Sequence, residues 1–384
     1  MSKIVISGYY GFNNAGDEAL LTAILASLRA IEPKADITVI SGNPGNTIVK
    51  HQVKSLYRFA AVRLLRAIGE ADLVISGGGS LLQDVTSKRS LVYYLSIIAA
   101  AKWKGRKVML FAQGIGPIRN RFMRLLTRLV VSKADVITVR DQDSAEELAR
   151  MGVPAAKVEV TADSVLTLNP ASKLAGKTFL SEAGLDPYKP VIGVSVRDWP
   201  DNQHCLEQLG IALGNISEKY HAQIAVLPLQ VSMDKKASQQ LKSYIPKTKN
   251  KVVLVEGNYT TEEFLSIIGS FRLLIGMRLH ALIFAAVMKV PLMAISYDPK
   301  VDSFVKAIGA QAVGTVQTLD AAKVEKAAED LWGNDLKLQE QRIAVMRKLA
   351  QSNAAKALNC CTGEEFAIIL QTTYIKSCIL LMMN

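Results

Sequence analysis

The sequence has few aromatic residues and few cysteines, and each scarcity argues against a class of protein. Aromatic residues make up only 6% of its 384 positions, so a nucleic-acid surface built from stacked rings is not expected. The four cysteines form no C-x-x-C pair, and two of them, Cys360 and Cys361, are adjacent, which is a poor geometry for a disulfide. A reducing compartment is therefore favoured.

Long apolar segments are also lacking. The first residues hold a short β-like run but neither the apolar core nor the cleavage site of a signal peptide. No apolar run reaches the length of about 18 residues that a membrane-spanning helix needs. The nearest candidate, residues 367–383, is interrupted by Gln371 and Lys376. We therefore expect a cytoplasmic protein without a transmembrane helix.

Acidic residues are scarce in the first third of the chain. Residues 1–134 hold 19 Lys/Arg and 7 Asp/Glu, whereas residues 135–384 hold 27 of each, so the whole net charge of +12 falls in the first third. Residues 37–69 contain no Asp or Glu. An anionic partner is therefore expected at this part of the chain.

A second acid-free stretch, residues 119–133, has helical spacing, with Arg121, Arg124 and Arg128 on one stripe. A basic amphipathic helix is typical of a surface that binds anionic lipid. The alternative is an ordinary core-facing helix with a solvated basic face. Nucleic acid is a third option, which the scarcity of aromatics disfavours.

Short β-branched runs alternate with helical stretches, which predicts parallel sheets with crossover helices. We expect an α/β domain over residues 1–170, an irregular linker over 169–190, a second α/β domain over 190–320 and a C-terminal helical segment over 321–384. The expected strands are residues 3–7, 37–41, 73–76, 108–113, 136–139, 158–161, 191–196, 224–229, 252–255, 273–275 and 292–296. The predicted fold class is α/β with two Rossmann-like domains facing a cleft, which resembles the GT-B architecture of many sugar-handling transferases.

Glycine-rich turns follow three of these strands, over residues 8–18, 76–84 and 111–117. Ligands of open α/β sheets bind at the carboxyl ends of strands, where glycines permit close backbone approach and a helix start offers N–H groups to an anion. The alternatives are a helix start capped by Asp17 and Glu18 and a flexible crossover turn. Three consecutive glycines in the second turn are hard to explain by packing alone. The residues expected to contact a substrate there are Asn14, Gly16, Gly78, Gly79 and Ser80.

Cationic side chains also follow the expected strands. Arg140 comes after residues 136–139, and a guanidinium fork there suits a carboxylate or phosphate. The alternative to a ligand-binding role is that Arg140 only forms a local ion pair with Asp141 or Asp143. Arg197 follows residues 191–196 beside Asp198 and has the same ambiguity.

A further segment places Arg278 and His280 at the start of an apolar helix, and Lys300 follows the next strand. A helix start depresses the pKa of a histidine ring and a bound anion raises it, which favours an acid role for such a ring once an anion is bound. The alternative is a histidine that only caps or packs. No residues have the spacing of metal ligands, so no metal is predicted.

Together, five segments resemble the polysaccharide pyruvyl transferases of the CsaB type, which modify secondary cell-wall polymer precursors in Gram-positive bacteria. The segments are GYYGFNNAGDE (8–18), GGGSLLQD (77–84), QGIGP (113–117), VRD (139–141) and GMRLH (276–280). The resemblance covers roughly residues 3–320. It implies a GT-B-like fold, phosphoenolpyruvate as donor, a lipid-linked saccharide with N-acetylmannosamine as acceptor and a 4,6-ketal-pyruvate as product. It also implies that Arg140, Arg278, His280 and Lys300 lie at the donor.

The chemistry of that reaction agrees with these residue types. Phosphoenolpyruvate carries a phosphate and a carboxylate, so its site needs cations and backbone donors. His280 is the candidate acid and Asp17 the candidate base for the acceptor protons. No cofactor is required. The basic first domain then faces the acceptor and anionic lipid at the inner face of the cell membrane, and the second domain is the donor side.

Two other functions stay open. A GT-B glycosyltransferase would use a sugar nucleotide and carry a nucleotide-reading carboxylate after Gly276, where Arg278 and His280 stand instead. A non-catalytic membrane- or nucleic-acid-binding module would use only the basic first domain.

Overall fold

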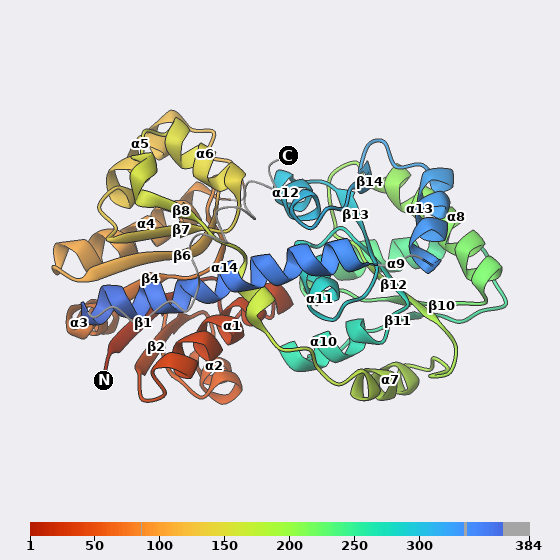
Figure 1. Ribbon diagram of the computed structural model, residues 1–384, viewed down its shortest axis with the longest axis horizontal. Coiled ribbons are helices and arrows are strands. Elements are labelled where there is room, and N and C mark those ends of the chain that lie inside the picture. Colours follow the sequence, from red (N-terminus) through yellow and green to blue (C-terminus); the bar gives the residue numbers. More distant parts are fainter. Residues whose placement is uncertain (86, 334–335, 364–384) are drawn as a thin grey trace. The chain divides into compact units, whose positions relative to one another are not determined.

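The chain forms two units, each built on a parallel β-sheet (Figure 1). The computed structural model describes residues 1–85, 87–333 and 336–363. The first unit comprises Met1–Thr167 and the part of helix α14 (Lys337–Thr362) that begins at Ala344. The second unit comprises Leu168–Ile343.

The sheet of the first unit has the strand order β3-β2-β1-β4-β6-β7-β8, with β5 paired to β6. Apolar β-branched runs form its central strands, as expected for strands that are buried on both faces. The strands are β1 (Lys3–Ser7), β2 (Asp36–Ser41), β3 (Lys54–Tyr57), β4 (Leu73–Ser76), β5 (Gly79–Leu82), β6 (Lys107–Ile115), β7 (Val136–Val139) and β8 (Val158–Val160).

Neighbouring residues of a strand point to opposite faces, so continuously apolar strands make both faces of this sheet apolar. Helices cover both faces. In β1, Val5 joins a core with α3, α4 and α6, whereas Ile4 and Ile6 join a core with α1 and α14. The helices in this unit besides α14 are α1 (Ala15–Ile31), α2 (Pro44–His51), α3 (Ala61–Glu70), α4 (Lys88–Trp103), α5 (Arg121–Val131) and α6 (Gln142–Arg150).

The sheet of the second unit has the order β11-β10-β9-β12-β13-β14, the strand order of a dinucleotide-binding Rossmann fold. Helices α8, α9 and α13 pack on one face, and α11 packs on β12 and β13. The strands are β9 (Val191–Ser195), β10 (Gln223–Val226), β11 (Val252–Leu254), β12 (Leu273–Gly276), β13 (Leu292–Ser296) and β14 (Ala312–Thr315). The helices are α7 (Lys173–Glu182), α8 (Gln203–Tyr220), α9 (Val231–Tyr244), α10 (Thr261–Gly269), α11 (Leu279–Val287), α12 (Pro299–Ala307) and α13 (Ala321–Gly333).

Two expected boundaries are wrong. The segment 169–190 is not an irregular linker, because Lys173–Glu182 forms α7 within the second unit. The segment from residue 321 is helical as expected over its described residues, but it is divided between the units, because α13 belongs to the second and α14 from Ala344 belongs to the first. Ala354, Ala357 and Leu358 of α14 lie in the core beside α1. The apolar run at 367–383 and Cys378 lie outside the described residues.

Two of the expected glycine turns also differ from the structure. Gly79–Leu82, expected as part of a turn, forms β5 beside β6. Gly114 lies inside β6, which continues to Ile115, so the turn expected over 111–117 is largely strand. Within residues 1–85, 87–333 and 336–363, no helix combines the length and the apolar character needed to cross a bilayer.

Candidate functional site

Each sheet has a point where the strand order reverses, and ligands of open α/β sheets bind outside the carboxyl ends of the strands there. In the first unit this point lies between β1 and β4, where Ser7 is in register with Ser76. In the second unit it lies between β9 and β12, where Ser195 is in register with Gly276. The loops that follow these four strands therefore carry the candidate site residues of each unit.

The loop after β1 is held in place by its own side chains. Asn14 is the N-cap of α1, and its Oδ1 accepts the N–H of Gly16 at 3.0 Å. Glu18 accepts the N–H of Gly11 at 2.8 Å and lies 2.9 Å from Nε2 of His51. Burial alone raises the pKa of a carboxyl group, but the hydrogen bonds from His51 and Gly11 outweigh it and lower the pKa of Glu18. Glu18 therefore anchors this loop as an ion.

Contacts inside the protein explain why the turn after β4 is made of glycines. A Cβ on Gly77 would lie 2.2 Å from Oη of Tyr10, and a Cβ on Gly78 would lie 2.9 Å from Cδ2 of Leu20. Gly79 has φ +91° and lies against Asp17, whose Oδ1 would be 3.2 Å from an added Cβ. These glycines were expected to be hard to explain by packing alone, but close contacts with Tyr10, Leu20 and Asp17 account for them, and they bring the second turn against the start of α1.

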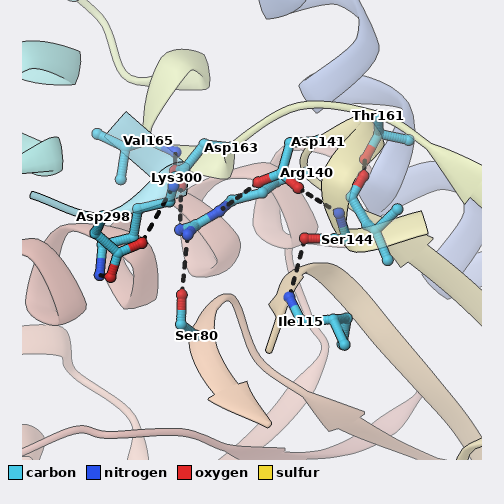
Figure 2. Close-up of polar contacts among 11 residues, drawn as sticks. Ser80, Ile115, Arg140, Asp141, Ser144, Thr161, Asp163, Val165, Asp298 and Lys300 are labelled. Carbon is cyan, nitrogen blue, oxygen red and sulfur yellow. Dashed lines mark hydrogen bonds and ion pairs between the residues drawn. The ribbon is translucent and has the colours of Figure 1, made fainter. Parts of the chain in front are cut away.

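Arg140, which follows β7, is held by three hydrogen bonds from its guanidinium (Figure 2). Its Nη2 donates to Oγ of Ser80 at 2.9 Å, its Nη1 to Asp163 at 3.3 Å and its Nε to Asp141 at 3.3 Å. The side chain is only 5% exposed, and a Cβ on Gly114 would lie 2.7 Å from Nη2, so any other residue there would displace the guanidinium. The structure thus brings together two expected site residues, Arg140 and Ser80, and joins them to Asp163. The local pair of Arg140 with Asp141, expected as the alternative, is also present.

Arg278, at the N-cap of α11, forms an ion pair that the sequence analysis missed. Its Nε lies 3.0 and 3.1 Å from the two carboxylate oxygens of Asp234, and its Nη2 also donates to that carboxylate. Asp234, in the first turn of α9, is fully buried and accepts the N–H of Gln230 at 3.0 Å. The spacing along the chain gives no sign of this pair, because α9 and α11 belong to different crossovers.

His280 lies in the first turn of α11, half-buried and two residues after Arg278. Lys300, in the first turn of α12, has its Nζ 3.0 Å from the carboxylate of Asp298, the N-cap of that helix; this pair is also drawn in Figure 2. The second unit therefore presents Arg278, His280 and Lys300 after its strands β12 and β13, as the sequence predicts.

The basic helix α5 differs from an ordinary core-facing helix. Leu126 and Val130 pack against the core, but Phe122, Leu125 and Leu129 are 65%, 49% and 55% exposed. Arg121 and Arg128 are exposed, whereas Arg124 is paired with Glu147. Val62 and Leu65 of α3 and Val92 of α4 are also exposed, and α4 packs against both α3 and α5. The face thus combines apolar and basic side chains on neighbouring helices.

Comparison with known proteins identifies the family. A family model described as polysaccharide pyruvyl transferase matches residues 14–299. The amylovoran biosynthesis protein AmsJ of Erwinia amylovora is 21% identical over an alignment of 368 positions, and the match covers 80% of this chain and 86% of that protein.

Solved structures agree on the fold. The UDP-N-acetylglucosamine 2-epimerase of Rickettsia bellii superposes with a TM-score of 0.62 at 12% identity, over 97% of this chain and 100% of that one. The enzyme of Neisseria meningitidis, bound to UDP-GlcNAc, superposes with a TM-score of 0.61 at 13% identity, over 93% and 100%. These likenesses confirm a GT-B-like α/β fold with two Rossmann-like domains. Because the family model spans most of the chain, the protein belongs to the polysaccharide pyruvyl transferase family and is a transferase.

Proposed function

We propose that the protein transfers the enolpyruvyl-derived group of phosphoenolpyruvate to a lipid-linked saccharide that contains N-acetylmannosamine, forming a 4,6-ketal-pyruvate on a secondary cell-wall polymer precursor. The observation that carries this proposal is the family match over residues 14–299, which includes the segment from Gly276 to His280. Cations and a histidine at the carboxyl ends of parallel strands suit a small, multiply anionic donor.

The reaction balances without a cofactor. A proton adds to the methylene carbon of phosphoenolpyruvate, so that positive charge develops at C2. Two hydroxyl oxygens of the sugar form bonds to C2, the bond from C2 to the phosphate oxygen breaks, and both hydroxyl protons leave. In this scheme His280 supplies the first proton, Asp17 accepts one hydroxyl proton, and the leaving phosphate carries away the other as hydrogen phosphate.

The remaining expected residues have binding roles in this proposal. Arg140 with Ser80, Arg278 and Lys300 bind the donor. Because each of these cations is already paired with a carboxylate, they offer directed N–H groups more than net charge. The loop residues Asn14, Gly16, Gly78 and Gly79 form the backbone-lined part of the site in the first unit.

Ligand preference separates this reaction from sugar transfer. Calorimetry is expected to detect binding of phosphoenolpyruvate to the whole protein and no binding of UDP-GlcNAc at the same concentrations. Pyruvate and inorganic phosphate serve as controls for the two halves of the donor. Binding of the nucleotide without binding of phosphoenolpyruvate would favour a glycosyltransferase instead.

The proposal also places the protein at the inner face of the cell membrane, with the α3–α4–α5 face of the first unit on anionic lipid. Phe122, Leu125 and Leu129 are exposed on α5 beside Arg121 and Arg128. Exposed apolar side chains rimmed by basic ones are typical of helices that lie in a bilayer interface. This location suits an acceptor anchored in the bilayer by its lipid.

Reversing Arg121 and Arg128 to glutamate is expected to lower binding to phosphatidylglycerol vesicles at least about tenfold, because each basic residue contributes about 1 kcal/mol at an anionic surface. The measurement is co-sedimentation at low salt, with phosphatidylcholine vesicles as the neutral reference. Reversal of Lys323 and Lys326, which are exposed on α13 of the other unit, makes the same charge change and should leave binding unaltered. Equal binding by the two double variants would exclude this face.

A further inference from the structure

The cations expected to bind the donor are already paired with carboxylates, so they do not balance the negative charge of phosphoenolpyruvate. Arg140 is paired with Asp141 and Asp163, Arg278 with Asp234, and Lys300 with Asp298. Phosphoenolpyruvate carries up to three negative charges, and an anion held in a partly buried site needs a cation that is not already neutralised. The second unit contains such a cation in Arg197.

Arg197 occupies the position where a ligand of this sheet is expected. It follows β9, one of the two strands at the reversal of strand order, and Arg278 and His280 follow the other, β12. The side-chain amide of Asn202 donates to the Arg197 carbonyl at 3.2 Å, which fixes the loop. The guanidinium therefore lies at the same sheet edge as the candidate acid.

Aromatic side chains lie against this guanidinium. Its Nη1 donates to Oη of Tyr297 at 3.2 Å, and its Cζ lies 5.3 Å from the ring centroids of both Trp199 and Tyr297. Trp199 and Tyr297 themselves meet edge to face at 4.9 Å. Among the residues that the structure describes, no Asp or Glu forms an ion pair with Arg197, and the neighbouring Asp198 is exposed.

This arrangement prepares the guanidinium for an oxyanion. Ring faces stabilise the positive charge and orient the guanidinium plane, and its N–H edges remain available for a carboxylate or phosphate. The Nε is buried and makes no hydrogen bond within the described part of the chain. A buried N–H group without an acceptor is unfavourable, and a hydrogen bond to a bound oxyanion would remove that penalty.

We propose that Arg197 binds an oxyanion of the donor, and that Tyr297 and Trp199 are positioning residues that hold its guanidinium. The identity of the anion as phosphoenolpyruvate rests on the proposed function. The site itself rests on the contacts of Arg197.

The test is calorimetric titration of the whole protein with phosphoenolpyruvate. Arg197→Gln is expected to weaken binding about 10- to 100-fold, the usual effect of losing hydrogen bonds to a charged group. Arg197→Lys should recover part of the loss, because charge returns without the planar fork. Tyr297→Phe keeps the ring and removes the hydroxyl, so a loss of a few-fold is expected.

Arg272 provides a matched control. It also stacks on an aromatic ring, that of Trp332, but it precedes β12 and so lies at the opposite edge of the same sheet. Arg272→Gln should bind phosphoenolpyruvate as the wild type does, and thermal unfolding shows whether each variant is folded. If a folded Arg197→Gln binds phosphoenolpyruvate with wild-type affinity, the role of Arg197 is refuted while the proposed function stands. If the wild type binds none, the proposed function fails first.

Discussion

Replacing His280 with alanine is expected to lower the rate of pyruvyl transfer by about 10²- to 10⁴-fold, the usual contribution of a positioned acid. Protonation of the methylene carbon is the step that makes C2 electrophilic. His280 lies in the first turn of α11, two residues after Arg278, where an imidazole can meet a bound anion. Because the side chain of His280 is only half-buried, its truncation removes little core packing, and the variant should remain folded.

Steady-state kinetics with phosphoenolpyruvate and a lipid-linked acceptor measure this effect. A catalytic acid predicts that kcat falls strongly while the affinity for phosphoenolpyruvate, measured by calorimetry, changes only a few-fold. His204→Ala is the control, because His204 is exposed at the start of α8. Turnover of His280→Ala close to that of the wild type would exclude His280 as the acid.

Replacing Asp234 with asparagine is expected to destabilise the protein by about 3–5 kcal/mol, because it leaves a buried guanidinium without its counter-charge. Asp234 is fully buried, and Arg278 is only 12% exposed, so solvent screens the pair weakly. The carboxylate also accepts the N–H of Gln230, which joins the start of α9 to the same network.

Urea unfolding at neutral pH measures the loss. The double variant Asp234→Asn with Arg278→Met should be more stable than the single variant Asp234→Asn, because it removes the unmatched charge as well. Asp330→Asn is the control, since Asp330 is exposed on α13. A change below about 1 kcal/mol for Asp234→Asn, as at an exposed pair, would contradict the structural role of this ion pair.

Strands were predictable where apolar runs are short and uninterrupted. The expected strands 73–76, 136–139 and 292–296 have the bounds of β4, β7 and β13. The strand β5 was missed because Gly79-Ser80-Leu81-Leu82 has the composition of a turn, and only its pairing with β6 makes it a strand. Likewise α14 crosses from one unit to the other, which no local pattern indicates.

The sequence located the cations of the site and one adjacent partner, Asp141 of Arg140, but not the partners that are distant along the chain. Arg140, Arg278 and Lys300 all follow strands, where ligands of open sheets bind, and the resemblance to the family singled them out as donor residues. Asp163 is 23 residues from Arg140, and Asp234 is 44 residues from Arg278. Such separations have no period and depend on how each crossover helix returns to the sheet. The sequence therefore could not show that Arg278 pairs with a carboxylate whereas Arg197 packs against aromatic rings; the structure shows both.

Pyruvyl transfer itself is tested most directly by the mass of the acceptor after incubation with phosphoenolpyruvate. The wild-type protein should convert a lipid-linked disaccharide that contains N-acetylmannosamine into a product heavier by one pyruvate less one water, with one inorganic phosphate released for each product. An acceptor of unchanged mass across a panel of lipid-linked disaccharides, or a mass increase that needs a sugar nucleotide in place of phosphoenolpyruvate, would contradict it.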